Sequence, residues 1–254
     1  MVHGIKKFKE YFENHSNQYV LIGGIACDIL MDDLGVPFRA TKDFDMVLII
    51  ENLDLSFGKT FWKFVEDGGY SNRKRSTGKR QYYRFTKPED SSFPKMIELF
   101  SRHPNNFQLN SDKGLTPIYI DETIASLSAI LLNDAYYNLL IEGNITVDGF
   151  SIIDIETLIL FKVKAWLDLK RRRESGNKVD SKDIKKHKND VFRLLVNVSP
   201  TARIKTVEVV QKDINQFVKQ IQNNKPDINN LGIRGTNFRE LMNIFKNTFL
   251  NIDK

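Results

Sequence analysis

A pair of glycines between two apolar segments is the feature that most constrains the fold of this chain. Residues 19–22 form a short apolar run of good strand formers, and Gly23 and Gly24 follow it directly. Glycine lets the backbone turn sharply and lets another group approach it closely. Apolar residues then recur at helical spacing as far as Gly35 and Pro37. This segment therefore predicts a strand, a glycine turn and a helix.

Two aspartates stand at the head of the next apolar run. Asp43 and Asp45 lead into residues 46–50, five consecutive apolar residues that suit a buried strand. Side chains alternate faces along a strand, so we expect the two carboxylates to share one face. Their mutual repulsion is unfavourable unless a cation neutralises it, and Mg²⁺ is the usual cation where the substrate is a phosphate. A bare Asp-x-Asp is more often a polar strand entrance, and the upstream glycines are what favour a site.

Together these segments resemble the signature of the nucleotidyltransferases of the DNA polymerase beta superfamily. That signature is an apolar residue, Gly-Gly or Gly-Ser, a helix, and Asp-x-Asp or Asp-x-Glu on the next strand; it corresponds here to Ile22-Gly23-Gly24 and Asp43-Phe44-Asp45. Within the superfamily, the run Arg39-x-Thr41-x-Asp43-x-Asp45 looks most like the AbiEii-type abortive-infection toxins. The spacer at residues 25–42 is longer than usual, and we assign the additional length to a loop at residues 32–38.

A third carboxylate lies in a later apolar segment. Glu98 belongs to a predicted strand at residues 95–100, with Met96 and Phe100 on its own face. A charged group in that position is unfavourable without a partner. The resemblance implies that Glu98 is the superfamily's third acid, on a strand beside the Asp-x-Asp strand. An edge-strand glutamate that faces water is the alternative.

The chain from Asp154 onwards is predicted to be helical. A long helix to about Arg173 has an apolar stripe that includes Lys162, whereas Lys164 points elsewhere. A lysine on a packing face should either extend to water or meet an anion. The resemblance implies that Lys162 contacts a nucleoside triphosphate, and an ordinary lysine extending to water remains the alternative.

A second helix is expected at about residues 180–196. The AbiEii-type family typically has an Asp-x-x-Asp pair in this region. Asp190 corresponds to its first residue, but Arg193 occupies the second position, so the pattern is only half matched.

The formal net charge of +6 and the pI near 9.2 favour an anionic partner such as RNA or nucleotide. The charge gathers in three basic segments, at residues 73–80, 170–173 and 182–188. Ordinary solvated surfaces explain such segments equally well.

Several classes of protein are disfavoured by composition. Charged or glycine residues interrupt every apolar stretch well before the ~20 residues of a membrane helix, and the first residues do not resemble a secretory signal. Cys27 is the only cysteine, which excludes an intramolecular disulfide and a cysteine-rich zinc site and favours a packing role. We expect a cytoplasmic protein without a membrane partner.

We therefore expect an α/β (α+β) fold in two domains. Residues 1–153 should form a small mixed β-sheet nucleotidyltransferase core, and residues 154–254 a helical domain. Short helices are expected at residues 123–132 and 134–141, and a hairpin around Asp148-Gly149.

The resemblance implies a metal-dependent transfer of a nucleoside monophosphate to an acceptor hydroxyl. Asp43, Asp45 and Glu98 would hold Mg²⁺ or Mn²⁺ and perform the catalysis. The NTP would be bound by Gly23, Gly24, Arg39, Thr41, Lys162 and Asp190. An RNA acceptor such as a tRNA 3′ end is expected, and a protein hydroxyl is the alternative acceptor. A non-catalytic module that binds nucleotide or RNA is a further alternative, which the presence of all three carboxylates disfavours. The resemblance also implies a toxin with a cognate antitoxin.

Overall fold

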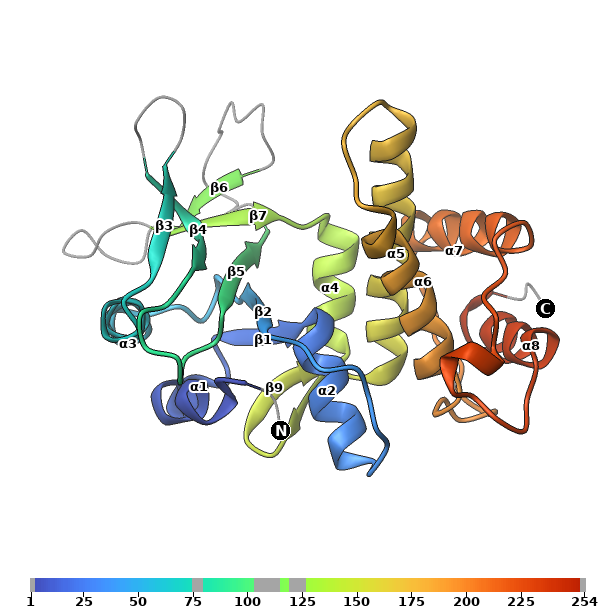
Figure 1. Cartoon of the computed structure of the whole chain (residues 1–254), viewed down its shortest axis with the longest axis horizontal. Helices are drawn as coiled ribbons and strands as arrows, with labels where there is room; N and C mark the ends of the chain where they lie inside the picture. The colour runs from blue at the N-terminus through green and yellow to red at the C-terminus, as the bar shows by residue number, and fades with distance from the viewer. Residues whose placement is uncertain (1–2, 75–79, 103–114, 119–126, 252–254) are drawn as a thin grey trace. The chain divides into compact units, whose positions relative to one another are not determined.

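Strand β1 (Tyr19–Ile22) is buried along its whole length and lies inside a mixed β-sheet. The computed structural model describes residues 3–74, 80–102, 115–118 and 127–251. The other strands are β2 (Asp43–Leu48), β3 (Ser71–Lys74), β4 (Arg80–Thr86), β5 (Met96–Ser101), β6 (Leu115–Ile118), β7 (Leu127–Leu131), β8 (Asn144–Val147) and β9 (Phe150–Ile153). Their main order is β3-β4-β5-β2-β1-β9-β8, and β7 pairs with both β5 and β6 (Figure 1).

The sheet contains both strand directions. Strand β1 is antiparallel to β2 and parallel to β9, while β2 is parallel to β5. At the far end, β8 and β9 form the predicted hairpin, with Asp148 and Gly149 both at positive φ in its two-residue turn. The mixed sheet together with the helices confirms the predicted mixed α/β class.

Aromatic side chains pack between helices α1 and α3 and one face of the sheet. The helices of the first 154 residues are α1 (Ile5–Phe12), α2 (Gly23–Asp33), α3 (Leu55–Asp67) and α4 (Asp134–Glu142), with a 3₁₀ turn at Glu13–His15. Phe8 of α1 is fully buried, with its ring 5.2 Å from that of Phe44 and 6.1 Å from that of Phe64 in α3. Because side chains alternate along β2, Asp43 and Asp45 lie on the face opposite Phe44.

Helix α2 begins at Gly23 itself, directly after β1, as the glycine pair predicts. The helix ends at Asp33, and residues 34–42, all of them described, reach β2 without forming a helix or strand. A loop is present where the sequence analysis expected one, except that residues 32 and 33 belong to the helix. Cys27 is fully buried in α2, which agrees with a packing role.

Residues 127–131 form strand β7, so the helix predicted over residues 123–132 is wrong there; residues 123–126 lie outside the described residues. Periodicity cannot separate a strand from a helix in a short apolar run. The outcome is decided by pairing, since β7 is parallel to β5 and antiparallel to β6. The second predicted helix is present as α4.

The C-terminal residues form helices around an aromatic core. These helices are α5 (Ile155–Glu174), α6 (Ser181–Leu195), α7 (Glu208–Ile221) and α8 (Phe238–Phe249), with a 3₁₀ turn at Asn229–Leu231. The ring of Phe217 lies 5.3 Å from that of Trp166 and 5.0 Å from that of Phe245. Asp180 caps α6 by accepting a 2.8 Å hydrogen bond from the backbone N–H of Lys182.

The chain divides into two compact units, Met1–Asp154 and Ile155–Lys254. The division falls one residue from the boundary that the sequence analysis placed between its two domains. Among the helices of the described ranges, none is long and apolar enough to cross a membrane.

Candidate active site

Pairing between β2 and β5 brings Glu98 next to Asp45. The two residues are partners in the parallel register, and Asp43 is opposite Met96. Neighbouring strands are about 4.8 Å apart, and residues in register point to the same face. Asp43, Asp45 and Glu98 therefore lie on one face of the sheet, and Phe44 lies on the other face. This arrangement of the backbone is the one expected if Asp43, Asp45 and Glu98 share one site.

The carboxylate of Asp45 lies against the glycine turn. On its other side, Asp45 is in register with Ile22, the last residue before that turn. A Cβ on Gly23 would lie 2.0 Å from Asp45 Oδ2, closer than real atoms approach. Gly23 also has a φ of 70°, a left-handed conformation that favours glycine. The carboxylate thus contacts the first residue of α2, at the positive end of the helix dipole.

Thr41 packs against Gly24, the second glycine of the pair. A Cβ on Gly24 would lie 2.7 Å from Thr41 Oγ1, and Thr41 is 8% exposed. The backbone N–H of Thr41 donates a 2.9 Å hydrogen bond to Asp28 Oδ2. Asp28 therefore ties the loop before β2 to α2. The sequence analysis did not select this residue, although its position one helical turn after Gly24 is a usable signal.

Arg39 lies in the same loop and is half-buried. Its guanidinium carbon is 5.7 Å from the centroid of the Phe38 ring, a cation–π distance. In this loop, Thr41 contacts the glycine pair, whereas the contact described for Arg39 is with its neighbour Phe38.

Glu98 has the partner that its position requires. The Nε of Arg84 donates a 2.8 Å hydrogen bond to Glu98 Oε1, and Arg84 Nη2 donates to the same oxygen. Arg84 is the residue directly opposite Glu98 on β4, and Glu98 is 8% exposed. Strand β5 is paired on both sides here, so the alternative of an edge-strand glutamate facing water is wrong. The sequence analysis missed Arg84, whose signal is a charged residue inside the apolar strand at residues 81–86.

The donor chemistry of the three carboxylates suits a hard divalent cation, because Mg²⁺ and Mn²⁺ prefer oxygen ligands. As oriented in the described residues, no three or more His, Cys, Asp or Glu side chains form a group that could hold a metal ion. The hydrogen bonds described for the Glu98 carboxylate both reach Oε1 and come from Arg84. The strand register thus brings the three residues to one face of the sheet, while the Glu98 side chain is hydrogen-bonded to Arg84.

Lys162 and Asp190 form a second group, within the C-terminal unit. Lys162 Nζ lies 3.3 Å from Asp190 Oδ2, and the side chains are only 3% and 0% exposed. Lys162 therefore meets an anion, one of the two outcomes expected for a lysine on a packing face. Arg193 Nη1 lies 3.5 Å from Asp190 Oδ1. The arginine at the second position of the half-matched pattern is thus an additional counter-ion of Asp190.

Lys164 points in a different direction from Lys162, as helical phase predicts. Its ammonium lies 3.1 Å from Asp168 and 3.4 Å from Asp213. Its side chain is 29% exposed, ten times the fraction of Lys162.

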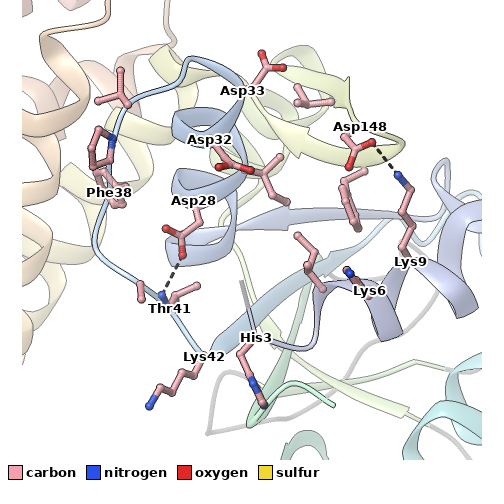
Figure 2. Close-up of a pocket in the computed structure, with 17 residues that line it drawn as sticks. His3, Lys6, Lys9, Asp28, Asp32, Asp33, Phe38, Thr41, Lys42 and Asp148 are labelled. Atoms are coloured by element: carbon pink, nitrogen blue, oxygen red, sulfur yellow. Dashed lines mark hydrogen bonds and ion pairs between the residues drawn. The ribbon is translucent and has the colours of Figure 1, made fainter. Parts of the chain in front are cut away.

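A cavity of 730 Å³ lies beside the loop that carries Arg39 and Thr41 (Figure 2). The loop, α1, α2 and the β8–β9 hairpin form its walls, which carry both lysines and aspartates. Two interactions join different walls of the cavity. The Thr41 N–H donates to Asp28, and Lys9 pairs with Asp148. Asp43 and Asp45 are not among its lining residues, so the cavity is separate from the carboxylate face.

Two of the three basic segments have described side chains. In the segment 170–173, Lys170 donates to Gln220 and lies 4.6 Å from the Trp166 ring, while Arg172 and Arg173 are exposed. In the segment 182–188, Lys188 donates a 2.9 Å hydrogen bond to the carbonyl of Asn224. The third segment includes residues 75–79, which lie outside the described residues.

No family model, curated protein or solved structure matches this chain. The resemblance to the DNA polymerase beta superfamily remains a prediction from the quoted residues.

Proposed function

We propose that this protein is a metal-dependent nucleotidyltransferase that moves a nucleoside monophosphate from an NTP to an acceptor hydroxyl. The observation that carries the proposal is the position of Asp45. Its strand neighbours are Ile22, directly before the glycine turn, and Glu98. The glycine pair and the N-terminus of α2 thus adjoin Asp45, and Asp43 and Glu98 project from the same face of the sheet. This arrangement supports the binding of a phosphate together with a divalent cation.

The metal ligands in this proposal are Asp43, Asp45 and Glu98. A bound Mg²⁺ or Mn²⁺ supplies Lewis-acid stabilisation of the charge that develops on the phosphates. The backbone N–H groups of Gly23 and Gly24 donate to phosphate oxygens.

Glu98 accepts the proton of the acceptor hydroxyl, whose oxygen forms a bond to the α-phosphorus while the bond to pyrophosphate breaks. Arg84 donates both of its hydrogen bonds to Oε1 of this carboxylate.

Four further residues are proposed to bind the nucleotide. Thr41 is in contact with the glycine pair, and Arg39 lies in the same loop as Thr41. Lys162 and Asp190 form a buried ion pair within the C-terminal unit, and their proposed role in nucleotide binding is carried over from the resemblance. The nucleotidyltransferase core and its helical C-terminal domain belong to this proposal.

RNA, for instance a tRNA 3′ end, is the proposed acceptor because of the exposed arginines in the segment 170–173 and the net charge of +6. A protein hydroxyl is the second candidate. Lys170 and Lys188 favour this candidate, because both already donate hydrogen bonds within their own unit and are therefore less available to RNA. A role as a cytoplasmic toxin with a cognate antitoxin goes with the RNA proposal.

The test is to incubate the purified protein with Mg²⁺, each labelled NTP in turn, and total cell RNA or total protein. We expect label in RNA, and no label with Asp43→Asn or Asp45→Asn. Asp148→Asn is the matched control, because it neutralises an exposed aspartate of the same unit that pairs with Lys9. Label in protein alone would replace RNA by a protein acceptor. Equal labelling by the wild type and both site variants would refute the proposed function.

A further inference from the structure

Arg84 supplies the positive charge nearest to Glu98 in the described structure. Oε1 of Glu98 accepts both hydrogen bonds from Arg84. The Glu98 side chain is buried, with 10% of its surface exposed. The two residues are opposite each other across the β4–β5 pair, so backbone pairing keeps their side chains on one face and within reach of each other.

The position of Arg84 matters because its partner is also a proposed metal ligand. Asp45 is in register with Glu98, and Asp43 points to the same face. Without a cation, these carboxylates would repel one another at close range. The guanidinium neutralises part of this charge in the protein as described.

A guanidinium and a divalent ion that share one carboxylate repel each other, because both are cations. They also compete for the oxygens of that carboxylate. Removal of the arginine charge should therefore strengthen binding of a divalent ion.

We propose that Arg84 is a competing counter-cation of the carboxylate site, an inference that rests on the proposed function. Arg84 neutralises Glu98 while no metal is bound and keeps the affinity for a free divalent ion low. The anionic triphosphate offsets this repulsion, so metal and nucleotide bind together. The protein thereby avoids holding a divalent ion when no substrate is present.

The test measures binding of Mn²⁺ to the full chain by electron paramagnetic resonance, without nucleotide. Arg84→Gln removes the charge but keeps a hydrogen-bond donor for Oε1, and we expect it to bind Mn²⁺ at least about tenfold more tightly than the wild type. Arg84→Lys keeps the charge, and we expect an affinity within about threefold of the wild type. Because both replacements retain a donor, each should keep the fold, which circular dichroism melting checks.

Arg102→Gln is the matched control. Arg102 pairs with Glu51 at a different place in the same unit, so its replacement removes the same charge without touching the site. We expect unchanged Mn²⁺ affinity.

The outcomes separate this inference from the proposed function. Unchanged or weaker Mn²⁺ binding by Arg84→Gln, in a protein that transfers label, would overturn the role of Arg84 alone. Equal tightening by Arg84→Gln and Arg102→Gln would also overturn it, since the effect would then come from net charge. If Asp45→Asn binds Mn²⁺ as the wild type does, the metal site itself, and with it the proposed function, is refuted.

Discussion

Asp45 and Gly23 are in such close contact that a Cβ on the glycine would lie 2.0 Å from Asp45 Oδ2. The carboxylate occupies the space in which any other residue would carry its side chain. The φ of 70° at Gly23 adds a second reason for glycine, because this conformation is unfavourable for other residues. Strand β2 therefore brings its aspartate to the start of α2 only because residue 23 is glycine.

We predict that Gly23→Ala destabilises the protein more than its φ alone explains. Gly35 is a matched control, since it has a φ of 67° and nothing within 4 Å of a Cβ. Gly35→Ala should cost about 1–2 kcal/mol for the left-handed conformation. Gly23→Ala should cost at least about 2 kcal/mol more, because Asp45 must move. Urea unfolding measures the loss of stability in both variants. Equal losses would show that the contact with Asp45 does not contribute to the cost of Gly23→Ala.

Lys162→Met should be strongly destabilising, because it removes the 3.3 Å ion pair of Asp190, whose side chain is 0% exposed, and leaves the longer 3.5 Å contact to Arg193. Breaking a buried pair costs about 3–5 kcal/mol, and the arginine places the expected value near the lower end. Lys164→Met, which removes partly exposed pairs, should cost less than about 1 kcal/mol. Chemical denaturation of the two variants gives the comparison.

The double variant Lys162→Met/Asp190→Leu should recover most of the stability, since both members of the buried ion pair are replaced and Arg193, 27% exposed, still reaches water. It also separates packing from nucleotide binding. If it folds stably and binds NTP as tightly as the wild type, the proposed nucleotide role of Lys162 and Asp190 is wrong. We expect it to fold and to lose NTP affinity.

Binding to RNA should depend on salt through the exposed basic residues. Each phosphate contact releases counterions, so Arg172→Gln/Arg173→Gln should weaken binding and reduce the slope of log K against log salt by up to about 2. Lys212→Gln is the control, because Lys212 is exposed in α7 outside the basic segments. Filter binding of tRNA between low and high salt provides the slopes. An unchanged slope in the arginine variant would remove this segment from the RNA interface.

Stability should also depend on pH through Glu51. Burial by itself raises the pKa of Glu51, but hydrogen bonds from the Tyr137 hydroxyl at 2.7 Å and from Arg102 outweigh it, so the pKa lies below its ordinary value of 4.5. A lowered pKa in the folded state stabilises the protein above pH 4.5, and this contribution is lost as the pH falls through the folded-state pKa.

Glu51→Gln should therefore lower stability at pH 7 by less than about 1 kcal/mol, because the carboxylate is 41% exposed and solvent screens the pair. The difference from the wild type should shrink below pH 4.5. Thermal melting across pH 3–7, about the range in which carboxylates titrate, is the measurement. A difference that stays constant over this range would rule out ionisation of Glu51 as its cause.

The local parts of the candidate site follow from local sequence patterns. Alternation along β2 places Asp43 and Asp45 on one face, and the glycine pair marks the junction of β1 and α2. Helical phase separates Lys162 from Lys164 in the same way. These patterns have periods of two or 3.6 residues, so a few consecutive residues suffice to detect them.

Long-range pairing was decided only in the tertiary structure. The contact of Arg84 with Glu98, the hydrogen bond from Thr41 to Asp28 and the strand at residues 127–131 all depend on segments distant in sequence. No periodic signal specifies which strand lies beside which, because register is set by packing of complementary side chains. The sequence by itself determined which residues point to a common face. The tertiary structure decided which of these residues are in contact, and it placed Arg84 beside Glu98.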